Sequence, residues 1–410
     1  MFDRVSRRKR FVVGARMTRN TDAEGRGPFR VVATSAVFLP GYRGGGPIRS
    51  VAHILDTLPE DIDLRLLTSD RDLGEMSPYP GLSGRWIPRG RSRIFYLDVR
   101  NSRQWWKVLR ELRSGPIDLL YVNSLWQPVF TLVPMVALRL GILRSAAVLI
   151  APRGELSPGA LTLKGRKKHA VLRILRPLLR SLNVNWHAST ALERTHIRGN
   201  FPGANVYVNS NQSSLPLEPL GPATLSAMST RIVFIGRVSP KKNLRLLIES
   251  LGDIGRGIAL DIYGPLEDRQ YWQDCLRTVI NLPPNITVMY CGELAHSDVR
   301  ETFATYDAFA FPTLGENFGH VIAESLSASC PVICSDQTPW SDVLRGGGGI
   351  VLAGLSRESL TRALAEFAAC SPMERQKRRV GAGDTYRTWR LATEPQSHIF
   401  DAVRATHSST

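Results

Sequence analysis

An alternation of short apolar runs with one helical segment, over residues 308–340, constrains the fold of this chain most. Ala308–Phe311 is apolar and stops at a proline, which predicts a buried strand. Phe318–Ala328 has helical spacing, and Pro331–Cys334 predicts the next strand. Strand, loop, helix and strand in this order form the repeating unit of a helix-covered parallel sheet. We therefore expect an α/β fold.

Two carboxylates flank the start of the helix, Glu316 in the loop before it and Glu324 within it. If the chain between them is mostly helical, they lie about 12 Å apart. The carboxylate pair of a glycoside hydrolase is closer, at about 5–10 Å. We therefore interpret the two residues as contacts to different parts of one long ligand.

This stretch resembles the signature of the retaining glycosyltransferases of family 4. The resemblance rests on ENFGHVIAE, in which Glu316 and Glu324 are the terminal residues, and on SDQTPW further on. Ser329 departs from the pattern, because the family usually has a glycine at the turn after the helix. The resemblance implies two Rossmann-like domains that face each other across a cleft, the B-type glycosyltransferase fold.

The chain of 410 residues is long enough for two domains with full cores. We interpret residues 1–27 as a disordered basic tail, 28–214 as the first domain and 230–385 as the second. Residues 215–229 belong to a stretch rich in Ser, Pro and Gly and are interpreted as the linker. Residues 386–410 resemble the C-terminal segment that crosses back to the first domain in this fold.

The positive charge of the chain is concentrated in its first half. Residues 1–214 hold 34 Lys and Arg against 15 Asp and Glu, whereas residues 215–410 hold 19 against 21. The first half of the chain, with this excess of positive charge, is suited to bind phosphate groups or anionic lipid. No nucleic-acid recognition motif accompanies it, so we do not expect a nucleic-acid partner.

The segment Lys164–Leu182 is basic and apolar by turns and predicts an amphipathic helix. The apolar residues expected on one face of it are Val171, Ile174, Leu175, Leu178 and Leu182. One interpretation is a surface helix that docks this face on the sheet. The other is a helix at an anionic membrane surface, and both hold if only the basic face meets lipid headgroups.

The sequence predicts a cytoplasmic protein with peripheral contact at the inner face of the plasma membrane. Its five cysteines have neither metal-type spacing nor a disulfide framework. The most apolar long window, Leu125–Leu143, contains Gln, two Pro and Arg and is not a membrane span. The basic N-terminus lacks the apolar core of a signal peptide.

A glycine-rich loop follows the first predicted strand, Phe29–Pro40, and precedes a segment with helical spacing. Strand, glycine-rich loop and helix bring backbone N–H groups against phosphate. The loop lacks G-x-G-x-x-G spacing, so it does not favour a nicotinamide dinucleotide, and it can also be only a tight turn. By the resemblance, Gly44, Gly45 and Gly46 would close over a diphosphate.

Arg153 follows the predicted strand Ala146–Ala151, at the strand end where open α/β sheets bind ligands. The stretch PRGELSPGAL resembles a subset of the family in which Arg-Gly replaces the usual His-Gly. The resemblance implies that Arg153 faces the donor or the acceptor; the alternative is an arginine that anchors a loop carboxylate. His187 and His196 lack a partner motif, so we expect structural roles for them.

Arg237 and Lys242 lie five residues apart after the strand Arg231–Ile235. Ser239 and the proline after it predict the N-cap and first residue of a helix over Lys241–Leu251. Two cations at a helix N-terminus form a site for a diphosphate. The GR-x4-K arrangement resembles the donor-phosphate clamp of family 4, and a surface salt bridge is the alternative.

The resemblance implies transfer of a hexose from a nucleotide diphosphate sugar to an acceptor hydroxyl, with retention of the anomeric configuration. The cations would stabilise charge that develops on the diphosphate, the loop after Glu316 would hold the sugar, and Glu324 would bind the ribose. We expect metal independence and no cofactor, because no Asp-x-Asp lies near these motifs. The residues expected to carry the reaction are Glu316, Arg237, Lys242 and Arg153, and those expected to bind substrate are Gly44, Gly45, Gly46, Asn317, Phe318, Gly319 and Glu324.

The basic first domain would bind the acceptor. A saccharide or lipid-linked saccharide at the membrane fits its charge, as in cell-surface polysaccharide biosynthesis. The main alternative is a non-catalytic, nucleotide-sugar-binding scaffold of the same fold. A nicotinamide-dependent oxidoreductase would need the full glycine fingerprint and an acidic ribose ligand about 20 residues further on.

Overall fold

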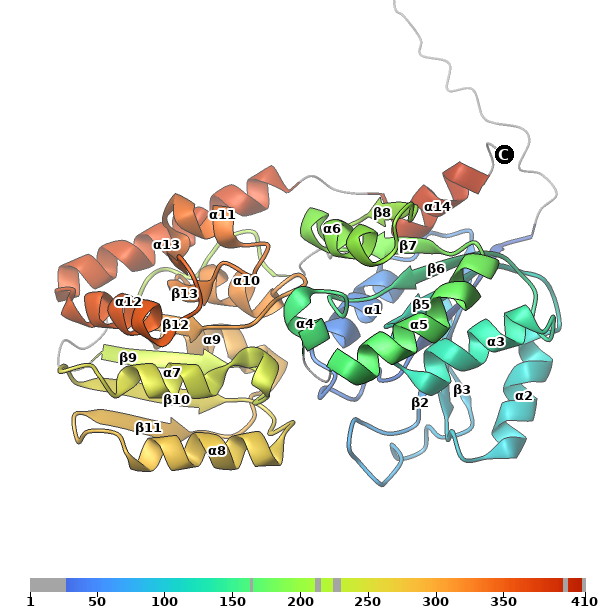
Figure 1. Ribbon diagram of the computed structural model, residues 1–410. Helices are drawn as coiled ribbons and strands as arrows, with labels where there is room; N and C mark the ends of the chain where they lie inside the picture. The colour runs from blue at the N-terminus through green and yellow to red at the C-terminus, as the bar shows by residue number, and fades with distance from the viewer. Residues whose placement is uncertain (1–26, 163–164, 211–214, 224–229, 394–396, 408–410) are drawn as a thin grey trace, which may run out of the picture.

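The computed structural model describes residues 27–162, 165–210, 215–223, 230–393 and 397–407. The tail predicted for residues 1–27 therefore lies outside the described residues apart from its last residue, and so does residue 164 of the predicted basic helix. The chain forms two α/β domains side by side, the first on the right and the second on the left of Figure 1.

The first domain is built on an eight-stranded sheet with the order β3-β4-β2-β1-β5-β6-β7-β8. Its strand pairs are parallel except for the edge pair of β3 and β4. Central strands such as β1 and β5 are buried along nearly their whole length, as expected where helices cover both faces. The strands are β1 Phe29–Ser35, β2 Ile62–Ser69, β3 Trp86–Arg89, β4 Ser92–Leu97, β5 Ile117–Asn123, β6 Ser145–Ala151, β7 Asn185–Ala188 and β8 Val206–Val208.

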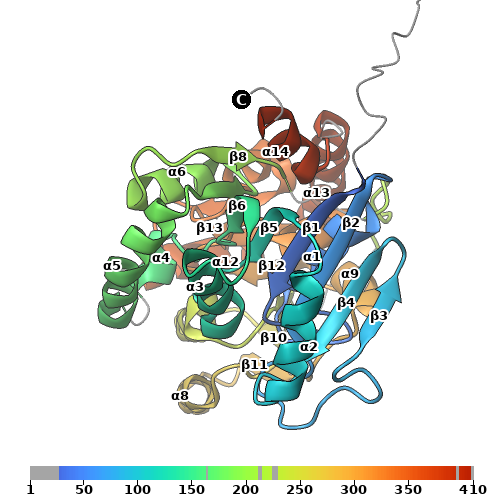
Figure 2. The same ribbon diagram turned by 90° about the vertical axis from the view of Figure 1, so that its right-hand side faces the viewer.

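Two separate apolar cores lie on the two faces of this sheet. One face is covered by α1 and the C-terminal helix α14, the other by α2, α3, α5 and α6, as Figures 1 and 2 show. The helices are α1 Gly46–Asp56, α2 Ser102–Leu112, α3 Val133–Arg139, α4 Pro158–Thr162, α5 Gly165–Ser181, α6 Ala191–Asn200 and α14 Ile399–His407, and a π-helical turn at Pro128–Leu132 precedes α3.

The buried face of α5 differs from the predicted one. Leu172, Leu175 and Leu179 are buried, whereas Val171 and Ile174 are exposed, Ile174 to 73%. Apolar residues occur in adjacent pairs along this helix, so two overlapping stripes have helical spacing. Periodicity alone could not choose between them; packing against the first-domain core selected the stripe one residue further on.

The second domain is built on a parallel six-stranded sheet with the order β11-β10-β9-β12-β13-β14. Its strands are β9 Thr230–Ile235, β10 Ile258–Tyr263, β11 Ile286–Tyr290, β12 Ala308–Phe311, β13 Val332–Ser335 and β14 Gly349–Leu352. Its helices are α7 Leu244–Leu251, α8 Arg269–Ile280, α9 Val299–Ala304, α10 His320–Ser327, α11 Ser341–Val343, α12 Arg357–Ala369 and α13 Pro372–Ala392, with shorter turns at Pro240–Lys242, His296–Asp298 and Leu344–Gly348. The two sheets confirm the predicted pair of Rossmann-like domains.

Each sheet has one point where the order of its strands reverses. In the first sheet β1 lies between β2 and β5, and in the second β9 lies between β10 and β12. Loops that leave such neighbouring strands at their carboxyl ends turn to opposite faces and leave a crevice, where α/β proteins bind ligands. Residues that follow β1, β9 and β12 line one cavity, so the two crevices meet between the domains.

The chain between the domains lies along the second domain over residues 215–223. The backbone N–H of Leu220 donates to the carbonyl of Ser327 at 2.8 Å, and the Tyr386 hydroxyl donates to the carbonyl of Pro216 at 2.6 Å. Ser329, where the resemblance expects glycine, adopts a left-handed φ of 52°. Its hydroxyl donates to the carbonyl of Leu220 at 2.6 Å, so this serine also fastens the connection.

Helix α13 continues to Ala392, beyond residue 386, at which we placed the start of the crossing segment. Tyr386 is fully buried in the core of the second domain and packs against Trp389, which keeps this part of the helix in that domain. Among the described residues, contact with the first domain resumes at Ser397, whose carbonyl accepts a hydrogen bond from Nδ2 of Asn209 at 2.8 Å, and continues with α14. There Phe400 packs against Tyr121 of the first sheet, with ring centroids 5.5 Å apart.

A buried ion pair fastens α13 to the second sheet. Arg375 lies 3.3 Å from Asp307, and their side chains are 8% and 4% exposed. Asp307 also accepts a hydrogen bond of 2.8 Å from the backbone N–H of Arg231, next to the start of β9. Because buried charges need partners, this pair fixes where the helix lies.

None of the helices in the described part of the chain is both long and apolar enough to span a bilayer.

We expect Asp307→Asn to lower the free energy of unfolding of the second domain by about 3–5 kcal/mol, because it leaves the Arg375 charge buried without its partner. Combining it with Arg375→Met should recover part of the loss, since no unpaired charge then remains. Chemical denaturation monitored by tryptophan fluorescence measures both.

Asp253→Asn is the matched control, since its pair with Arg357 has side chains 52% and 46% exposed. We expect a loss of at most about 1 kcal/mol there. An equally small loss at Asp307 would contradict the role assigned to the buried pair.

Candidate active site

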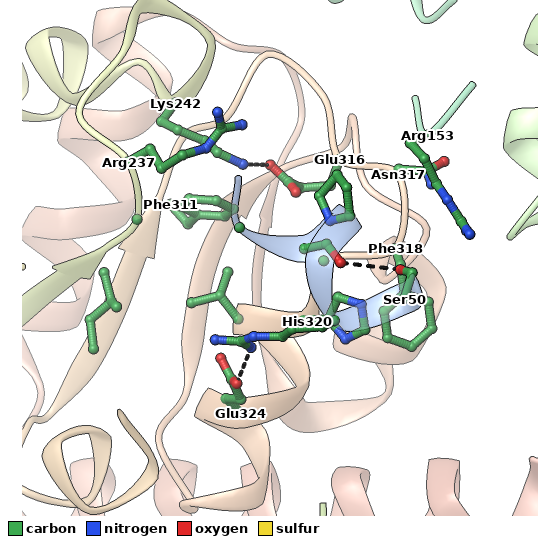
Figure 3. Close-up of a pocket in the computed structure, with 18 of the residues that line it drawn as sticks. Ser50, Arg153, Arg237, Lys242, Phe311, Glu316, Asn317, Phe318, His320 and Glu324 are labelled. Atoms are coloured by element: carbon green, nitrogen blue, oxygen red, sulfur yellow. Dashed lines mark hydrogen bonds and ion pairs between the residues drawn. The ribbon is translucent and has the colours of Figure 1, made fainter. Parts of the chain in front are cut away.

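A cleft of about 220 Å³ opens between the domains and is lined by residues of both (Figure 3). The predicted residues that line it are Gly45, Gly46, Arg153, Arg237, Lys242, Glu316, Asn317, Phe318, Gly319 and Glu324. Gly44 does not line it, because this residue packs on Ile48, whose Cδ1 would lie 2.9 Å from a Cβ at Gly44. The cleft also contains Arg49, Ser50, Lys241 and His320, which sequence analysis did not single out.

Cations of the second domain line one wall of the cleft. Arg237 follows β9 and pairs with Glu267 at 2.9 Å. Lys242 forms an ion pair with Glu316, and its Nζ lies 5.0 Å from the ring centroid of Phe311. Burial lowers the pKa of Lys242. Burial also works to raise the pKa of Glu316, but Lys242 and Lys241 hold that pKa below its ordinary value, so Glu316 is ionised.

The helix predicted over Lys241–Leu251 begins later than expected. Pro240–Lys242 forms a 3₁₀ turn, Asn243 has a left-handed φ of 58°, and α7 starts at Leu244. The side chain of Ser239 makes no capping hydrogen bond. Ser239 and Pro240 begin the 3₁₀ turn, but the left-handed Asn243 interrupts the run of helical hydrogen bonds, so the prediction that they begin the longer α-helix is wrong. The positive character of this wall therefore comes from the side chains rather than from the start of α7.

Two other helices begin at the cleft, one from each domain. Helix α1 follows Gly45, and α10 follows Gly319, and no side chain caps either start. A Cβ at Gly45 would lie 3.6 Å from Nε of Arg237, so the backbone of the glycine-rich loop approaches this cation closely. Uncapped helix starts present free N–H groups and a positive dipole end. Together with the lysines and arginines, they make the cleft suited to an anion.

A carboxylate three residues after the end of β2 fixes the glycine-rich loop. Asp72 accepts hydrogen bonds from the backbone N–H groups of Tyr42 and Arg43, at 3.0 and 3.4 Å. Gly41 must lack a side chain, since a Cβ there would lie 2.2 Å from the hydroxyl of Tyr79. The loop is therefore held in position before any ligand binds.

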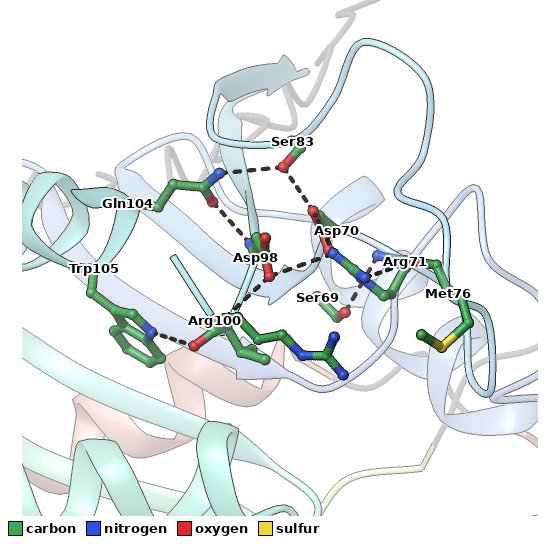
Figure 4. A network of polar contacts seen from close by, with 10 residues as sticks. Ser69, Asp70, Arg71, Met76, Ser83, Asp98, Arg100, Gln104 and Trp105 are labelled. Atoms are coloured by element: carbon green, nitrogen blue, oxygen red, sulfur yellow. Dashed lines mark hydrogen bonds and ion pairs between the residues drawn. The ribbon is translucent and has the colours of Figure 1, made fainter. Parts of the chain in front are cut away.

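The segment between β2 and β3 is held by the polar network in Figure 4. Asp70 accepts hydrogen bonds from Nε of Arg71 at 2.8 Å and from the hydroxyl of Ser83 at 2.7 Å. Gln104, on α2, donates to Ser83 at 3.3 Å. These contacts tie the segment that contains Asp72 to the body of the first domain.

An ion pair crosses the cleft between the domains. Glu324 on α10 is 4% exposed and pairs with Arg49 on α1, and Nδ1 of His296 lies 3.5 Å from the same carboxylate. Burial raises the pKa of Glu324, and Arg49 offsets this in part. Sequence analysis missed Arg49. Its place in the first turn of α1, directly after the glycine-rich loop, is the signal that could have found it.

Arg153 is buried at the end of β6 with a left-handed φ of 55°. Its Nε donates to Oδ1 of Asn123 at 2.8 Å, and one of its terminal nitrogens donates to the hydroxyl of Tyr121 at 2.7 Å. That hydroxyl lies 3.0 Å from Nδ1 of His187. Burial lowers the pKa of His187 to about 3, so its ring is neutral and Nδ1 can accept. His187 therefore supports Arg153 from behind.

Glu155 anchors the same loop from inside the protein. Its carboxylate accepts hydrogen bonds from the hydroxyl of Ser124 at 2.7 Å and the backbone N–H of Leu125 at 2.5 Å. Burial raises its pKa to about 7, and these hydrogen bonds only partly oppose the shift.

Within the described residues, no cluster of three or more His, Cys, Asp or Glu side chains could hold a metal ion.

Comparisons with known proteins fit this geometry. Residues 222–382 match the family model described as glycosyl transferases group 1. O-antigen chain mannosyltransferase B of Escherichia coli is 28% identical over 125 residues, which are 29% of this chain and 32% of that protein. The chain thus matches about a third of that relative's length.

Solved structures resemble the whole two-domain arrangement. HepE of Anabaena in complex with UDP and glucose aligns with a TM-score of 0.65 and 15% identity, over 93% of this chain and 100% of that one. Sucrose-phosphate synthase from Thermosynechococcus elongatus aligns with a TM-score of 0.65 and 14% identity, over 94% and 100%. At these identities the likeness shows the fold alone, and it confirms the predicted B-type arrangement.

We expect Glu155→Gln to flatten the pH dependence of stability. The native pKa of Glu155 is about 7, above its ordinary 4.5, so the native state binds more protons than the unfolded state between these values. Stability therefore falls as pH rises through this window. From about pH 5 to about pH 8, the wild type should lose roughly 3 kcal/mol more unfolding free energy than the variant.

Urea denaturation at a series of pH values measures this difference. Glu60→Gln, at a side chain 87% exposed, is the control and should follow the wild type. Parallel pH profiles for the wild type and Glu155→Gln would show that the Glu155 carboxyl is solvated.

Proposed function

We propose that this protein is a retaining glycosyltransferase, because residues 222–382 match the family model described as glycosyl transferases group 1. It would move a hexose from a nucleotide diphosphate sugar to an acceptor hydroxyl. One observation carries the proposal. The cleft joins two helix N-termini, from different domains, to the cations Arg237 and Lys242 and to two buried carboxylates.

The cations and helix starts are suited to the departing group. When the bond between the anomeric carbon and the diphosphate oxygen breaks, the electron pair and extra negative charge remain on the diphosphate. The positive wall of the cleft stabilises the transition state, in which this charge develops, more than it stabilises the bound substrate. This difference lowers the activation barrier. The cations of the wall are Arg237, Lys241 and Lys242. With these cations in place, we expect the reaction to need no divalent metal. HepE, which has the same fold, binds UDP and glucose.

We assign both carboxylates to substrate binding rather than to nucleophilic attack, because each is already paired with a cation. Glu316 pairs with Lys242, beside the backbone of Phe318 and Gly319, where it would hold sugar hydroxyls. Glu324 would bind the ribose after Arg49 moves away from it. The acceptor oxygen would attack the face that the diphosphate leaves, and its proton would pass to the departing diphosphate, which gives retention.

We propose a growing or lipid-linked saccharide as the acceptor. The E. coli relative is named as an O-antigen chain mannosyltransferase, which supports polysaccharide biosynthesis as the setting. The acceptor would enter from the first domain, where Arg153 faces the cleft. The excess of positive charge on residues 1–214 favours an acceptor that carries phosphate.

The exposed side of α3 and α5 is suited to an anionic bilayer on the cytoplasmic side. The two helices pack together, and their exposed apolar residues are Val133, Val136, Leu140, Val171 and Ile174. Arg139, Arg173, Arg176 and Arg180 are exposed among them. Between residues 119 and 192 the only acidic residue is Glu155, and it is buried. Apolar side chains with arginines among them bind anionic lipid.

Calorimetric titration with UDP, GDP and ADP, and with their hexose derivatives, tests the donor site. We expect one base to bind, and Arg237→Ala and Glu324→Ala to weaken its affinity about tenfold or more, because each removes a charged hydrogen-bond partner. EDTA should change neither the binding nor the turnover of the hexose derivative with a saccharide acceptor.

Arg277→Ala is the control, since this residue is exposed on α8 outside the cleft. Binding without any turnover would favour the alternative, a non-catalytic nucleotide-sugar-binding scaffold. Binding of none of these nucleotides would contradict both proposals.

Sedimentation with vesicles tests the membrane surface. We expect binding to vesicles that contain anionic lipid and not to neutral vesicles. Changing Arg173, Arg176 and Arg180 to Gln should reduce the partition coefficient about fivefold per arginine, because each contributes about 1 kcal/mol.

The control changes Arg256, Arg277 and Arg362, which belong to the second domain, to Gln. Equal losses in the two triple variants would show that only net charge matters and would contradict a defined docking surface.

A further inference from the structure

Two buried polar atoms among the described residues of the cleft have no hydrogen-bond partner, Oδ1 of Asn317 and Nε2 of His320. Buried polar atoms in native proteins are nearly always hydrogen-bonded, because an unsatisfied one costs about 1–3 kcal/mol. Both atoms lie at the junction between the loop after β12 and the start of α10. We therefore asked which ligand group would satisfy them.

Neighbouring hydrogen bonds fix the orientation of the Asn317 amide. The Ser189 hydroxyl donates to the Glu193 carboxylate at 2.8 Å, so its hydrogen is already used. Ser189 can then only accept from Asn317, whose Nδ2 lies 2.6 Å away. The amide oxygen must face the other way. The side chain of Asn317 also packs tightly against Gly154 of the first domain. A Cβ added at Gly154 would lie 2.8 Å from the Cβ of Asn317, so there is no room there for a larger residue.

His320 is held in place and is uncharged. Its ring packs on Phe318, with ring centroids 4.6 Å apart, and its Cδ2 would lie 3.4 Å from a Cβ at Gly46 on the other side of the cleft. Burial, together with the nearby charges of Arg49 and Arg153, lowers its pKa to about 3. The imidazole is therefore a neutral hydrogen-bonding group within a strongly cationic cleft (Figure 3).

We propose that His320 and Asn317 recognise hydroxyl groups of the transferred sugar through their side chains. Arg237, Lys242 and the helix N-termini would already bind the negative charge of a diphosphate. A neutral imidazole and an amide oxygen would therefore contribute little to phosphate binding. A hydroxyl both donates and accepts, and it satisfies either atom without bringing a charge. His320 would thus be a specificity-determining residue, a step that rests on the proposed function.

The experiment compares two ligands that differ only in the sugar. Titration calorimetry measures the affinity for the nucleoside diphosphate that the wild type binds and for its hexose derivative. We expect His320→Leu to weaken binding of the hexose derivative about tenfold, because one buried hydrogen bond is lost, and to leave the nucleoside diphosphate within about twofold. His320→Gln should recover much of the loss, since its amide can replace Nε2.

Unchanged binding of the nucleoside diphosphate also shows that the variant is folded. His196→Leu, on α6 outside the cleft, is the control and should match the wild type for both ligands. Wild-type affinity of His320→Leu for the hexose derivative, or an equal loss for both ligands, would overturn the inference. If the wild type bound neither ligand, the proposed function itself would fail, which is a distinguishable result.

Discussion

The paired charges of the cleft are the interaction on which the rest of the site depends. Glu324 and Glu316 are both nearly excluded from solvent, and an isolated buried carboxylate would cost several kcal/mol. Each is therefore paired with a cation: Glu316 with Lys242 within the second domain, and Glu324 with Arg49 across the cleft. The Arg49–Glu324 pair joins α1 to α10, so the interaction that neutralises this buried charge also holds the two domains together.

The strand order of each sheet decides which residues can meet. Because both sheets reverse their order beside their first strand, the loops after β1, β9 and β12 converge on one cleft. Structural elements behind them keep these loops in place before a ligand arrives. Asp72 holds the glycine-rich loop, and Glu155, Tyr121 and His187 hold the loop of Arg153. The site is thus assembled from the edges of two rigid sheets, which suits a ligand that must contact both domains.

Predictions from local sequence patterns failed where the pattern was compatible with two local conformations or two buried faces. Paired apolar residues along α5 allowed two buried stripes, and packing chose Leu172, Leu175 and Leu179. Ser239 and its proline have the form of a helix start, but the left-handed Asn243 moved the start of α7 to Leu244. In both cases the competing conformations differ by contacts with distant parts of the chain, which a local pattern does not contain.

The sequence by itself predicted the α/β fold and two domains, because these follow from apolar runs and turn residues within single βα units. Motif spacings and the resemblance to family 4 predicted half of the residues that line the cleft. Only the tertiary structure decided which groups of different units meet. It brought Arg49 to Glu324 and left His320 neutral, and it used up the Ser189 hydroxyl so that the Asn317 oxygen faces away from it. These are properties of burial and of long-range contacts. They depend on how far two packed sheets approach each other, and no spacing along the chain encodes that distance.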